Sequence, residues 1–338
     1  MKTILVTGGA GYIGSHTVVK LLEQGYGVVI VDNLCNSKVN AIDQIESITG
    51  HKPAFYEGDV RDRALLAGIF EAHSIHGVMH FAGLKAVGES QAKPLLYYDN
   101  NVAGSITLLE EALKANVHTV VFSSSATVYG EPGTTQYDET LPTKPINVYG
   151  RSKLMVESIL TDLVNANPAL RVACLRYFNP VGAHSSGLIG EDPLGIPNNL
   201  MPYLGQVALG KLPSLKVYGN DYPTPDGTGL RDYIHVEDLA EGHCLALRYL
   251  DKNPGILTVN LGAERPYSVL EVIAAFEHAS GITIPYEFVG RRSGDLAEYF
   301  ANAQLAKRTL GWIAQHDLDR MCQDTWRFYQ RSRDSASQ

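Results

Sequence analysis

The stretch Thr7-Gly8-Gly9-Ala10-Gly11-Tyr12-Ile13-Gly14 decides the fold of this chain. It follows a short apolar run at Lys2–Val6 and opens a segment of helical periodicity at Ile13–Gln24. Gly8, Gly11 and Gly14 recur every three residues, and Gly9, Gly11 and Gly14 have the spacing G-x-G-x-x-G, which allows a tight turn and lets the backbone approach a pyrophosphate closely. The pyrophosphate would bind the free amides at the start of the helix. The stretch therefore predicts a dinucleotide site lined by Gly8, Gly11 and Gly14.

The next apolar run, Val28–Val31, ends in Asp32, about twenty residues beyond the glycines. A carboxylate at this place binds the hydroxyl groups of the adenosine ribose and repels a 2′-phosphate. We therefore expect NAD rather than NADP as the cofactor. The alternative is a glycine-rich turn whose aspartate only caps backbone groups.

Short apolar runs and helical patterns alternate through the first half of the chain. Runs that are apolar nearly throughout, with helices between them, are typical of a parallel sheet covered on both faces. Right-handed crossovers predict an α/β fold with a doubly wound parallel sheet of the Rossmann type. Further strands are expected at Ala54–Glu57, Val78–Phe81, Val120–Phe122 and Arg171–Tyr177.

The second half of the chain is less regular. After Asn179-Pro180, glycine, proline and asparagine are frequent and the expected elements are shorter. We predict an NAD-binding domain over residues 1–180 and a smaller C-terminal α/β substrate lobe over residues 181–338. A helix at Ile234–Tyr249 and a strand at Thr258–Leu261 are expected to rejoin the first sheet, so that residues 232–262 belong partly to the first domain.

Composition limits the classes of function. The 338 residues carry 28 basic and 36 acidic side chains, and the net charge of −8 argues against a nucleic-acid-binding face. No run of about eighteen apolar residues occurs, so no membrane partner is expected, and the lack of an export signal favours the cytoplasm. No metal site is predicted. The scattered cysteines are interpreted as unpaired thiols of a reducing compartment: Cys35, Cys174, Cys244 and Cys322.

Two further strand ends carry candidate cofactor contacts. Asp59 follows the third expected strand and Phe81-Ala82-Gly83 follows the fourth. Ligands of an open α/β sheet collect at these carboxyl ends. Asp59 is expected to bond the adenine amine; its alternative role is the N-cap of the next helix, because aspartate caps helices well.

Tyr149 and Lys153 lie four residues apart in a helical pattern, so they share one face. A nearby ammonium favours phenolate over phenol, and a positive nicotinamide ring would act in the same direction. We therefore predict that the pKa of Tyr149 is lowered from about 10 toward about 7, which takes roughly 4 kcal/mol. The result would be a base matched to cellular pH.

Ser123-Ser124-Ser125 ends the fifth expected strand. Alternation along a strand places Ser123 and Ser125 on one face and Ser124 on the other. Ser125 lies furthest out of the sheet and is predicted to stand between a sugar hydroxyl and Tyr149. The alternative is that the serines only end the strand and bond backbone groups.

Together these residues resemble the extended short-chain dehydrogenase/reductases, and most specifically the family of UDP-glucose (UDP-galactose) 4-epimerases. The resemblance covers nearly the whole chain, and several of its segments are too long to arise by chance. The segments are Thr7–His16, Asp32–Ser37, His80–Ser90, Ser123–Gly130, Tyr149–Glu157, Arg176–Gly182, Pro197–Pro202 and Arg231–Leu239.

The resemblance implies reversible C4 epimerisation of UDP-galactose and UDP-glucose through a 4-keto hexose, with tightly held NAD, in galactose metabolism. It implies that Tyr149 takes the 4-hydroxyl proton, that Ser125 helps to shuttle it and that Lys153 bonds the nicotinamide ribose. It also implies a homodimer. Further cofactor contacts are implied at Tyr12, Ile13, Asp32, Asn33, Leu34, Cys35, Asn36, Ser37, Asp59, Val60, Phe81, Ala82, Gly83, Lys85, Asn100 and Phe178. UDP-sugar contacts are implied at Asn179, Asn199, Leu200, Tyr218, Arg231, Tyr233, Arg292, Asp295 and Tyr299.

The residue types agree with the UDP-sugar roles. Arg231 and Arg292 offer planar forks for diphosphate oxygens, and Asp295 can accept from ribose hydroxyls. The alternatives are that Arg231 and Asp232 form a surface ion pair and that Arg291-Arg292 is a solvated face. Both alternatives remain open from the sequence.

Two tyrosines bear on the shape of the substrate pocket. Tyr299 resembles the family members with a narrow sugar pocket, which disfavours N-acetylated hexoses. Tyr218 stands where a phenylalanine often stacks on uracil, so stacking is preserved.

Three other functions compete with the epimerase interpretation. A nucleotide-sugar 4,6-dehydratase resembles it in the first oxidation but needs an Asp–Glu pair after the serine or threonine, where this chain has Ala126-Thr127. Another epimerase or a decarboxylase acting on UDP-sugar acids would use the same scaffold. A non-catalytic NAD-sensing regulator would keep the glycine turn without needing the tyrosine, lysine and serine.

Overall fold

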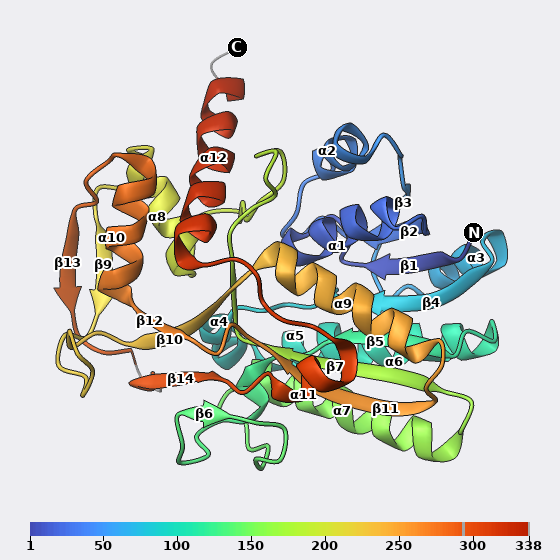
Figure 1. Ribbon diagram of the computed structural model, residues 1–338. Coiled ribbons are helices and arrows are strands. Elements are labelled where there is room, and N and C mark those ends of the chain that lie inside the picture. The colour runs from blue at the N-terminus through green and yellow to red at the C-terminus, as the bar shows by residue number, and fades with distance from the viewer. Residues whose placement is uncertain (293–294, 337–338) are drawn as a thin grey trace.

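The computed structural model describes residues 1–292 and 295–336, and its centre is a seven-stranded parallel sheet (Figure 1). The strand order is β3-β2-β1-β4-β5-β7-β11, so the direction of winding reverses between β1 and β4. This confirms the predicted doubly wound sheet. Its strands are β1 (Thr3–Thr7), β2 (Gly27–Asp32), β3 (Ala54–Glu57), β4 (Ile75–His80), β5 (Thr119–Ser123), β7 (Arg171–Tyr177) and β11 (Gly255–Leu261).

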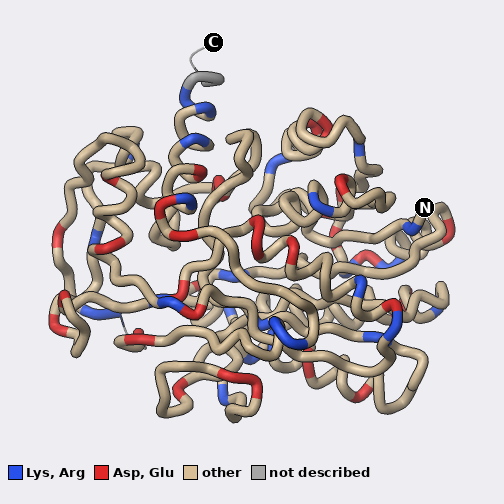
Figure 2. Tube along the Cα trace, in the orientation of Figure 1, with Lys and Arg blue, Asp and Glu red and all other residues tan. Residues whose placement is uncertain are grey.

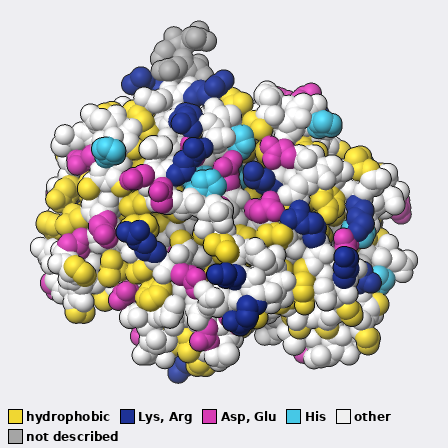
Figure 3. Space-filling view, in the orientation of Figure 1, with side chains coloured by type: hydrophobic (Ala, Val, Ile, Leu, Met, Phe, Trp, Pro, Cys, Tyr) yellow, Lys and Arg dark blue, Asp and Glu magenta, His cyan; other side chains and the backbone are white. Residues whose placement is uncertain are grey.

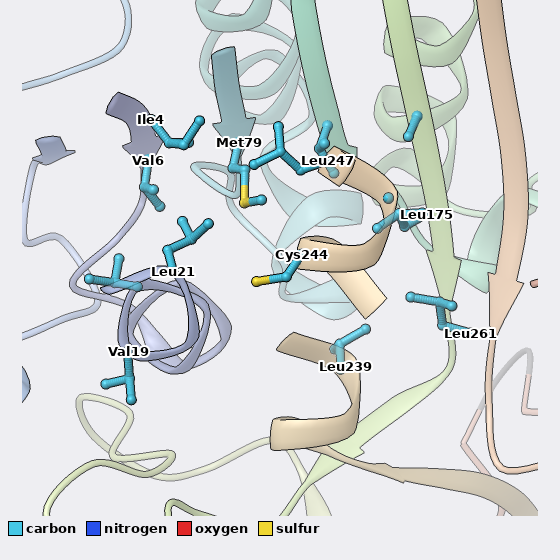
Figure 4. Packing of buried hydrophobic residues seen from close by; sticks show 14 of the residues in the cluster. Ile4, Val6, Val19, Leu21, Met79, Leu175, Leu239, Cys244, Leu247 and Leu261 are labelled. Atoms are coloured by element: carbon cyan, nitrogen blue, oxygen red, sulfur yellow. The ribbon is translucent and has the colours of Figure 1, made fainter. Parts of the chain in front are cut away.

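Helices cover both faces of this sheet because its strands are apolar on both sides. Ile4 and Val6 of β1 pack toward α1 and α9, whereas Leu5 packs toward α3 and α6. Figure 4 shows the first of these interfaces, where Leu21 of α1 and Cys244 of α9 lie close to Met79 of β4. The helices of this part are α1 (Tyr12–Glu23), α2 (Asn40–Thr49), α3 (Arg63–Ala72), α4 (Val87–Ala92), α5 (Pro94–Tyr97), α6 (Gly104–Lys114), α7 (Val148–Ala166) and α9 (Val236–Leu250). A π-helical turn, η1 (Tyr98–Ala103), and a 3-10 turn, η2 (Ala126–Val128), complete the set.

The predicted return of the chain to the first sheet is confirmed. β11 pairs in parallel with β7, from Gly255 opposite Arg171 to Leu261 opposite Tyr177. The predicted start of the preceding helix is wrong by two residues, because strand β10 (Leu230–His235) runs through His235. His235 has an extended backbone and its Nδ1 accepts from the amide of Glu237 at 3.0 Å, so it caps α9 instead of lying inside it.

Most of the remaining elements form a second layered region, on the left of Figure 1, whereas α11 (Gln304–Leu310) packs against β11 and α9 of the first region. β10 pairs with β8, β12 and β14, and β9 pairs with β13. β6 comes from the first half of the chain but pairs with β14, so the two regions share strands, and the division at residue 180 stays a prediction. The elements are β6 (Gln136–Tyr137), β8 (Asn179–Val181), α8 (Leu200–Ala208), β9 (Leu215–Tyr218), β12 (Pro266–Ser268), α10 (Val269–Ser280), β13 (Tyr286–Val289), β14 (Glu298–Ala301), α11 (Gln304–Leu310) and α12 (Leu318–Ala336).

Charged residues of both signs are scattered over the described part of the chain trace (Figure 2). On the face shown in Figure 3, basic side chains follow α12 and acidic side chains lie beside them. Arg320 and Arg327 of that helix both pair with Asp324. Within residues 1–292 and 295–336, no helix is both long and apolar enough to cross a membrane.

Candidate functional site

The glycine turn closes against the end of the neighbouring strand. Gly8 has a φ of 71°, and a Cβ placed on it would stand 2.7 Å from the backbone nitrogen of Ala82. A Cβ on Gly14 would stand 2.2 Å from the carbonyl oxygen of Gly8, so only glycine fits at either place. Gly11 precedes α1 and makes no side-chain cap, which leaves the first amides of the helix for an anion. The turn therefore fits the pyrophosphate of a dinucleotide.

Asp32 organises the loop that follows β2. Its carboxylate accepts from the amides of Ala10 at 3.0 Å and Leu34 at 2.9 Å, and from the hydroxyl of Ser37 at 2.8 Å. A carboxylate offers about four acceptor positions, so Asp32 keeps capacity for a ribose hydroxyl. Among the predicted cofactor contacts in this loop, Asn33, Cys35 and Asn36 are exposed.

Asp59 lies beside that loop and is held by Arg61. The Arg61 guanidinium donates to it from Nε at 2.8 Å and Nη2 at 2.7 Å and holds the pKa of Asp59 well below its usual range. Asn33 donates to the same carboxylate at 2.9 Å. The N-cap alternative for Asp59 is wrong, because Asp62 caps α3 and accepts from the amide of Leu65.

The segment Phe81–Gly83 is fixed by the backbone of β1. The amides of Phe81 and Ala82 both donate to the carbonyl of Thr7, at 3.0 and 3.1 Å. A Cβ on Gly83 would stand 3.3 Å from Oδ1 of Asn101 and 3.7 Å from Nζ of Lys153. Asn101 was not predicted, yet it is buried and holds the main chain of Leu84 through both its amide oxygen and its amide nitrogen. The sequence offered one signal for Asn101, because this residue directly follows Asn100, which was expected to contact the cofactor.

Ser125, Tyr149 and Lys153 lie together at the carboxyl end of β5. Asn147 caps α7 by accepting from the amide of Gly150 at 2.7 Å, which places Tyr149 in the first turn of the helix. Ser125 hydrogen-bonds the Tyr149 phenol. Nζ of Lys153 lies 6.0 Å from the centre of the tyrosine ring. All three side chains are buried.

The predicted direction of the Tyr149 pKa shift is wrong. Burial raises the pKa of the Tyr149 phenol well above its usual value, and nearby Tyr177 raises it further, while the hydrogen bond with Ser125 opposes both effects. The ammonium of Lys153 donates to the carbonyl of Ser123 at 2.8 Å, and it does not offset the effect of burial on Tyr149. Burial also lowers the pKa of Lys153 to about 8. The four-residue spacing predicts that Tyr149 and Lys153 share a face of the helix. It does not predict that the ammonium of Lys153 donates to the carbonyl of Ser123.

A buried ionic group that the sequence did not predict lies behind this trio. Glu157 of α7 accepts from Nε of Arg176 at 3.0 Å and from Nη2 at 2.6 Å, and from the hydroxyl of Ser124 at 2.5 Å. Ser124 thus points away from Ser125, as strand alternation predicts. The available signal was the spacing of Glu157, four residues after Lys153.

Four of the predicted UDP-sugar residues gather around β10 and β14. Nη2 of Arg231 lies 3.5 Å from Oδ1 of Asp295, and its guanidinium carbon lies 4.7 Å from the ring centre of Tyr299. The phenol of Tyr299 donates to Oδ1 of Asn179 at 3.4 Å. The surface ion pair alternative is wrong, because Asp232 is fully buried and accepts three backbone amides instead of Arg231.

The two neighbouring arginines take different partners. The guanidinium carbon of Arg292 lies 3.9 Å from the ring centre of Tyr218, and Arg291 pairs with Asp221 over the ring of Tyr222. Both arginines are exposed, but each is stacked on a tyrosine and not simply solvated. A nucleobase that stacks on Tyr218 must use the other face of the tyrosine ring or displace the Arg292 guanidinium from this face.

Glu191 joins a predicted cofactor contact to a predicted substrate contact. Its Oε1 lies 2.8 Å from Nζ of Lys85 and 2.8 Å from Nδ2 of Asn199. The phenol of Tyr329 donates to its carbonyl at 2.9 Å. The sequence did not single out Glu191, because it lies in a loop without periodicity.

The other predicted contacts are less directly joined to this site. Tyr12 donates from its phenol to the carbonyl of Gly182 at 2.7 Å and so connects the glycine turn with the second region. The structure places Val60, Phe178 and Tyr233 in apolar clusters, and leaves Ile13, Asn100 and Leu200 partly exposed. The individual contacts with NAD and with a UDP-sugar stay predictions.

Known proteins resemble the whole chain. It is 58% identical over 332 residues to the UDP-glucose 4-epimerase of Neisseria meningitidis serogroup B (strain ATCC BAA-335 / MC58), covering 97% of each chain. The crystal structure of a UDP-glucose-4-epimerase from Stenotrophomonas maltophila with bound NAD and formylated UDP-arabinopyranose has a TM-score of 0.97 and 53% identity, covering 99% of this chain and 100% of that one. The UDP-glucose 4-epimerase from Bifidobacterium longum in complex with NAD+ and UDP has a TM-score of 0.95 and 50% identity, covering 98% and 99%.

The match to a protein family spans both the parallel sheet and part of the second region. Residues 4–262 match the family described as the NAD dependent epimerase/dehydratase family. This range begins in β1 and ends just after β11, so it takes in the glycine turn, the serine run and the tyrosine–lysine pair. The chain therefore belongs to the NAD dependent epimerase/dehydratase family.

Proposed function

We propose that this chain interconverts UDP-galactose and UDP-glucose by reversible epimerisation at C4 of the hexose, through a 4-keto hexose and with tightly bound NAD. The reaction would serve galactose metabolism. The observation that carries this proposal is the meeting of Ser125, Tyr149 and Lys153 at the carboxyl end of β5, near a glycine turn that accommodates a pyrophosphate. The identity of 58% to a UDP-glucose 4-epimerase supports it.

The cofactor site is proposed on residues 1–180. Gly8 and Gly14 allow the tight turn, Gly11 precedes the free amides of α1 that would bind the pyrophosphate, and Asp32 favours an unphosphorylated ribose. Bound NAD supplies reversible hydride acceptance from C4 of the sugar. Lys153 lies 3.7 Å from a Cβ placed on Gly83, at the carboxyl ends of the central strands, where it is positioned to bond the nicotinamide ribose.

Proton transfer is assigned to Tyr149 with Ser125. Tyr149 removes the proton of the 4-hydroxyl group and later returns it, and Ser125 relays it between sugar and phenol. Because burial raises the pKa of Tyr149, the phenolate forms only when positive charge is added beside it. A bound, oxidised nicotinamide ring would add that charge to the charge already carried by Lys153.

The UDP-sugar is assigned to residues 181–338 with Asn179. Arg231 and Arg292 hold diphosphate oxygens, and Asp295 accepts from ribose hydroxyls. With the nucleotide held there, the 4-keto sugar would turn about its pyrophosphate linkage and present its other face. Return of the hydride to that face of C4, with the proton returned to the oxygen by Tyr149, would then give the opposite configuration. The other assigned contacts are Asn199, Leu200, Tyr218, Tyr233 and Tyr299.

The 4,6-dehydratase alternative is not favoured by the residues that follow Ser125. Elimination of water needs an acid pair, but Ala126 and Thr127 stand there, and Thr127 donates its hydroxyl to Ser125 at 2.9 Å. An NAD-sensing regulator has no need of the buried tyrosine and lysine. The epimerase reaction therefore accounts for more of the site.

A homodimer is proposed as the assembled form. Apolar side chains that are more than a third exposed lie on four helices, α4 to α7, of which α4 and α5 both pack against α7. Exposed apolar side chains gathered on one region are typical of an interface. They are Val87, Leu95, Leu96, Ile106 and Met155.

A reducing, cytoplasmic location is also proposed. The four cysteines are unpaired; Cys35 is exposed, and the others are buried. Burial raises the pKa of the Cys174 and Cys244 thiols, which keeps them protonated and unreactive. Unpaired thiols of this kind suit a compartment in which disulfides do not persist.

The function is tested by turnover. Purified protein, loaded with NAD, is expected to convert UDP-galactose to UDP-glucose and the reverse with no net change in added nicotinamide, measured by chromatography of the products. Protein that retains NAD but converts neither sugar nucleotide would contradict the epimerase proposal.

Tyr149→Phe is expected to lower kcat by roughly two to four orders of magnitude, because the variant keeps the ring and loses the proton-transfer group. Its melting temperature is expected to stay near that of the parent protein. Tyr97→Phe is the matched control, because Tyr97 is a buried tyrosine of α5 whose phenol bonds the carbonyl of Ala86. Equal turnover in the two variants would remove Tyr149 from its role.

Tyr299→Cys is expected to allow epimerisation of UDP-N-acetylglucosamine, because it removes bulk beside the proposed sugar position. Rates with UDP-galactose and UDP-N-acetylglucosamine are compared for both proteins. Tyr299→Phe keeps the bulk and should stay selective. Selectivity unchanged in the cysteine variant would show that Tyr299 does not limit the pocket.

The dimer is tested by light scattering of the NAD-loaded protein. The expected mass is twice the 36.8 kDa of one chain. Leu95→Lys is expected to shift the protein toward the monomer, because Leu95 is 80% exposed and a charge there opposes burial. Ile256→Lys, on the exposed side of β11, is the control and should leave the mass unchanged; a parent protein of one-chain mass would refute the dimer.

A further inference from the structure

We propose that Glu157 is a positioning residue for this site: its carboxylate keeps Lys153 charged and fixes the Ser123–Ser125 segment against α7. The inference rests on the proposed epimerase reaction and concerns a residue that acts through Lys153 and the serine segment. Glu157 follows Lys153 by one helical turn, as Lys153 follows Tyr149. The three side chains therefore form a single stripe on α7.

The carboxylate of Glu157 is held in one position by its donors. Arg176 of β7 binds both of its oxygens, and Ser124 donates to Oε1 at 2.5 Å. Glu157 and Arg176 are 5% and 7% exposed, so water does not screen this charge as it would on the surface. A bidentate pair of this kind fixes direction as well as distance.

The carboxylate of Glu157 also acts on Lys153 and Tyr149 through the serine run Ser123–Ser125. Ser124, which it binds, lies between two residues that contact the reactive side chains. The carbonyl of Ser123 accepts from Lys153 at 2.8 Å, and the hydroxyl of Ser125 bonds Tyr149. Fixing Ser124 therefore fixes the acceptor of Lys153 and the partner of Tyr149 together.

Glu157 also favours the protonated, charged form of Lys153. Burial lowers the pKa of Lys153 to about 8, and attraction by Glu157 opposes this effect. His80, on β4, adds no negative charge, and burial lowers its pKa to about 3, so it is neutral. The titratable groups facing Lys153 and its neighbours are Tyr149 and Glu157 of α7, His80 of β4, Lys85 of the loop after β4, Tyr97 of α5, and Arg176 and Tyr177 of β7. Glu157 is the acid among them.

The test is Glu157→Gln, which keeps the shape and removes the charge. The alkaline limb of the kcat–pH profile is expected to move to lower pH by about one to two units, because a unit charge about 6 Å away acts with this strength at an effective dielectric constant of about 20. The fraction of protein that retains nicotinamide after gel filtration at each pH is the second readout. It is expected to fall at correspondingly lower pH in the variant.

Two controls separate charge from structure. Ser124→Ala removes one hydrogen bond to the carboxylate of Glu157 but leaves its charge. The alkaline limb of the kcat–pH profile of this variant should therefore stay at the pH of the parent protein, even if kcat falls. Glu157→Asp retains the charge and should keep the limb within a few tenths of a unit. An unmoved limb in Glu157→Gln, or an equal shift in Ser124→Ala, overturns the proposal.

Removal of the acid alone leaves Arg176 buried without its partner, which can prevent folding. The double variant Glu157→Gln, Arg176→Gln removes both charges, and its limb is expected to move in the same direction because Glu157, not Arg176, acts on Lys153. An unmoved limb in this variant also refutes the role. If the parent protein itself fails to convert UDP-galactose, the failure belongs to the proposed function; a parent that converts it while the variant limb stays in place isolates the failure to Glu157.

Discussion

The close approach of two main chains at the carboxyl end of the sheet is the constraint on which the rest of the structure depends. Gly8 lies so near the backbone of Ala82 that any side chain on it would overlap the next strand end. Because β1 and β4 are neighbours at the point where the winding reverses, this contact sets the floor of the crevice in which ligands of such sheets bind. The helix that follows Gly11 then directs its free amides into the crevice.

Around that crevice the chain buries polar groups in satisfied pairs. Buried charges are costly unless their hydrogen bonds are complete, and Glu157 with Arg176 meets this condition through three donors. Asp32 and Asp232 meet it through backbone amides. Rigid polar groups of this kind hold reactive side chains in place without relying on the loops that carry them.

Local patterns predicted the strands of the central sheet, because nearly continuous apolar runs that alternate with helical patterns are typical of buried parallel strands. The strands ending at Asp32 and Tyr177 and the return of Leu261 to the sheet were all predicted. The start of α9 was not predicted correctly, because an apolar residue such as Ile234 fits a buried strand as well as a buried helix. The cap at His235 decided between them.

Contacts between residues that are distant in the sequence limited how much of the site could be predicted. The spacing of Tyr149 and Lys153 predicted that they share a face, but nothing near them in the sequence indicates that the lysine bonds Ser123. Burial, which depends on the whole fold, then reversed the expected direction of the Tyr149 pKa. The partners of Glu157 and Asp232 were missed for the same reason, since they lie on other elements of the fold. Residue types predicted the chemistry of the site, and tertiary contacts determined its electrostatics.

The place of β11 at the edge of the sheet has a consequence for how the protein is made. β7 is complete at Tyr177, but its outer edge stays unpaired on the ribosome until Gly255–Leu261 has emerged. Over the same interval α9 is missing from the face that it shares with α1. A chain stalled between these points presents an open strand edge and a bare apolar surface, the features that promote aggregation of nascent proteins. Protection by chaperones therefore matters most during synthesis of the second half of the molecule.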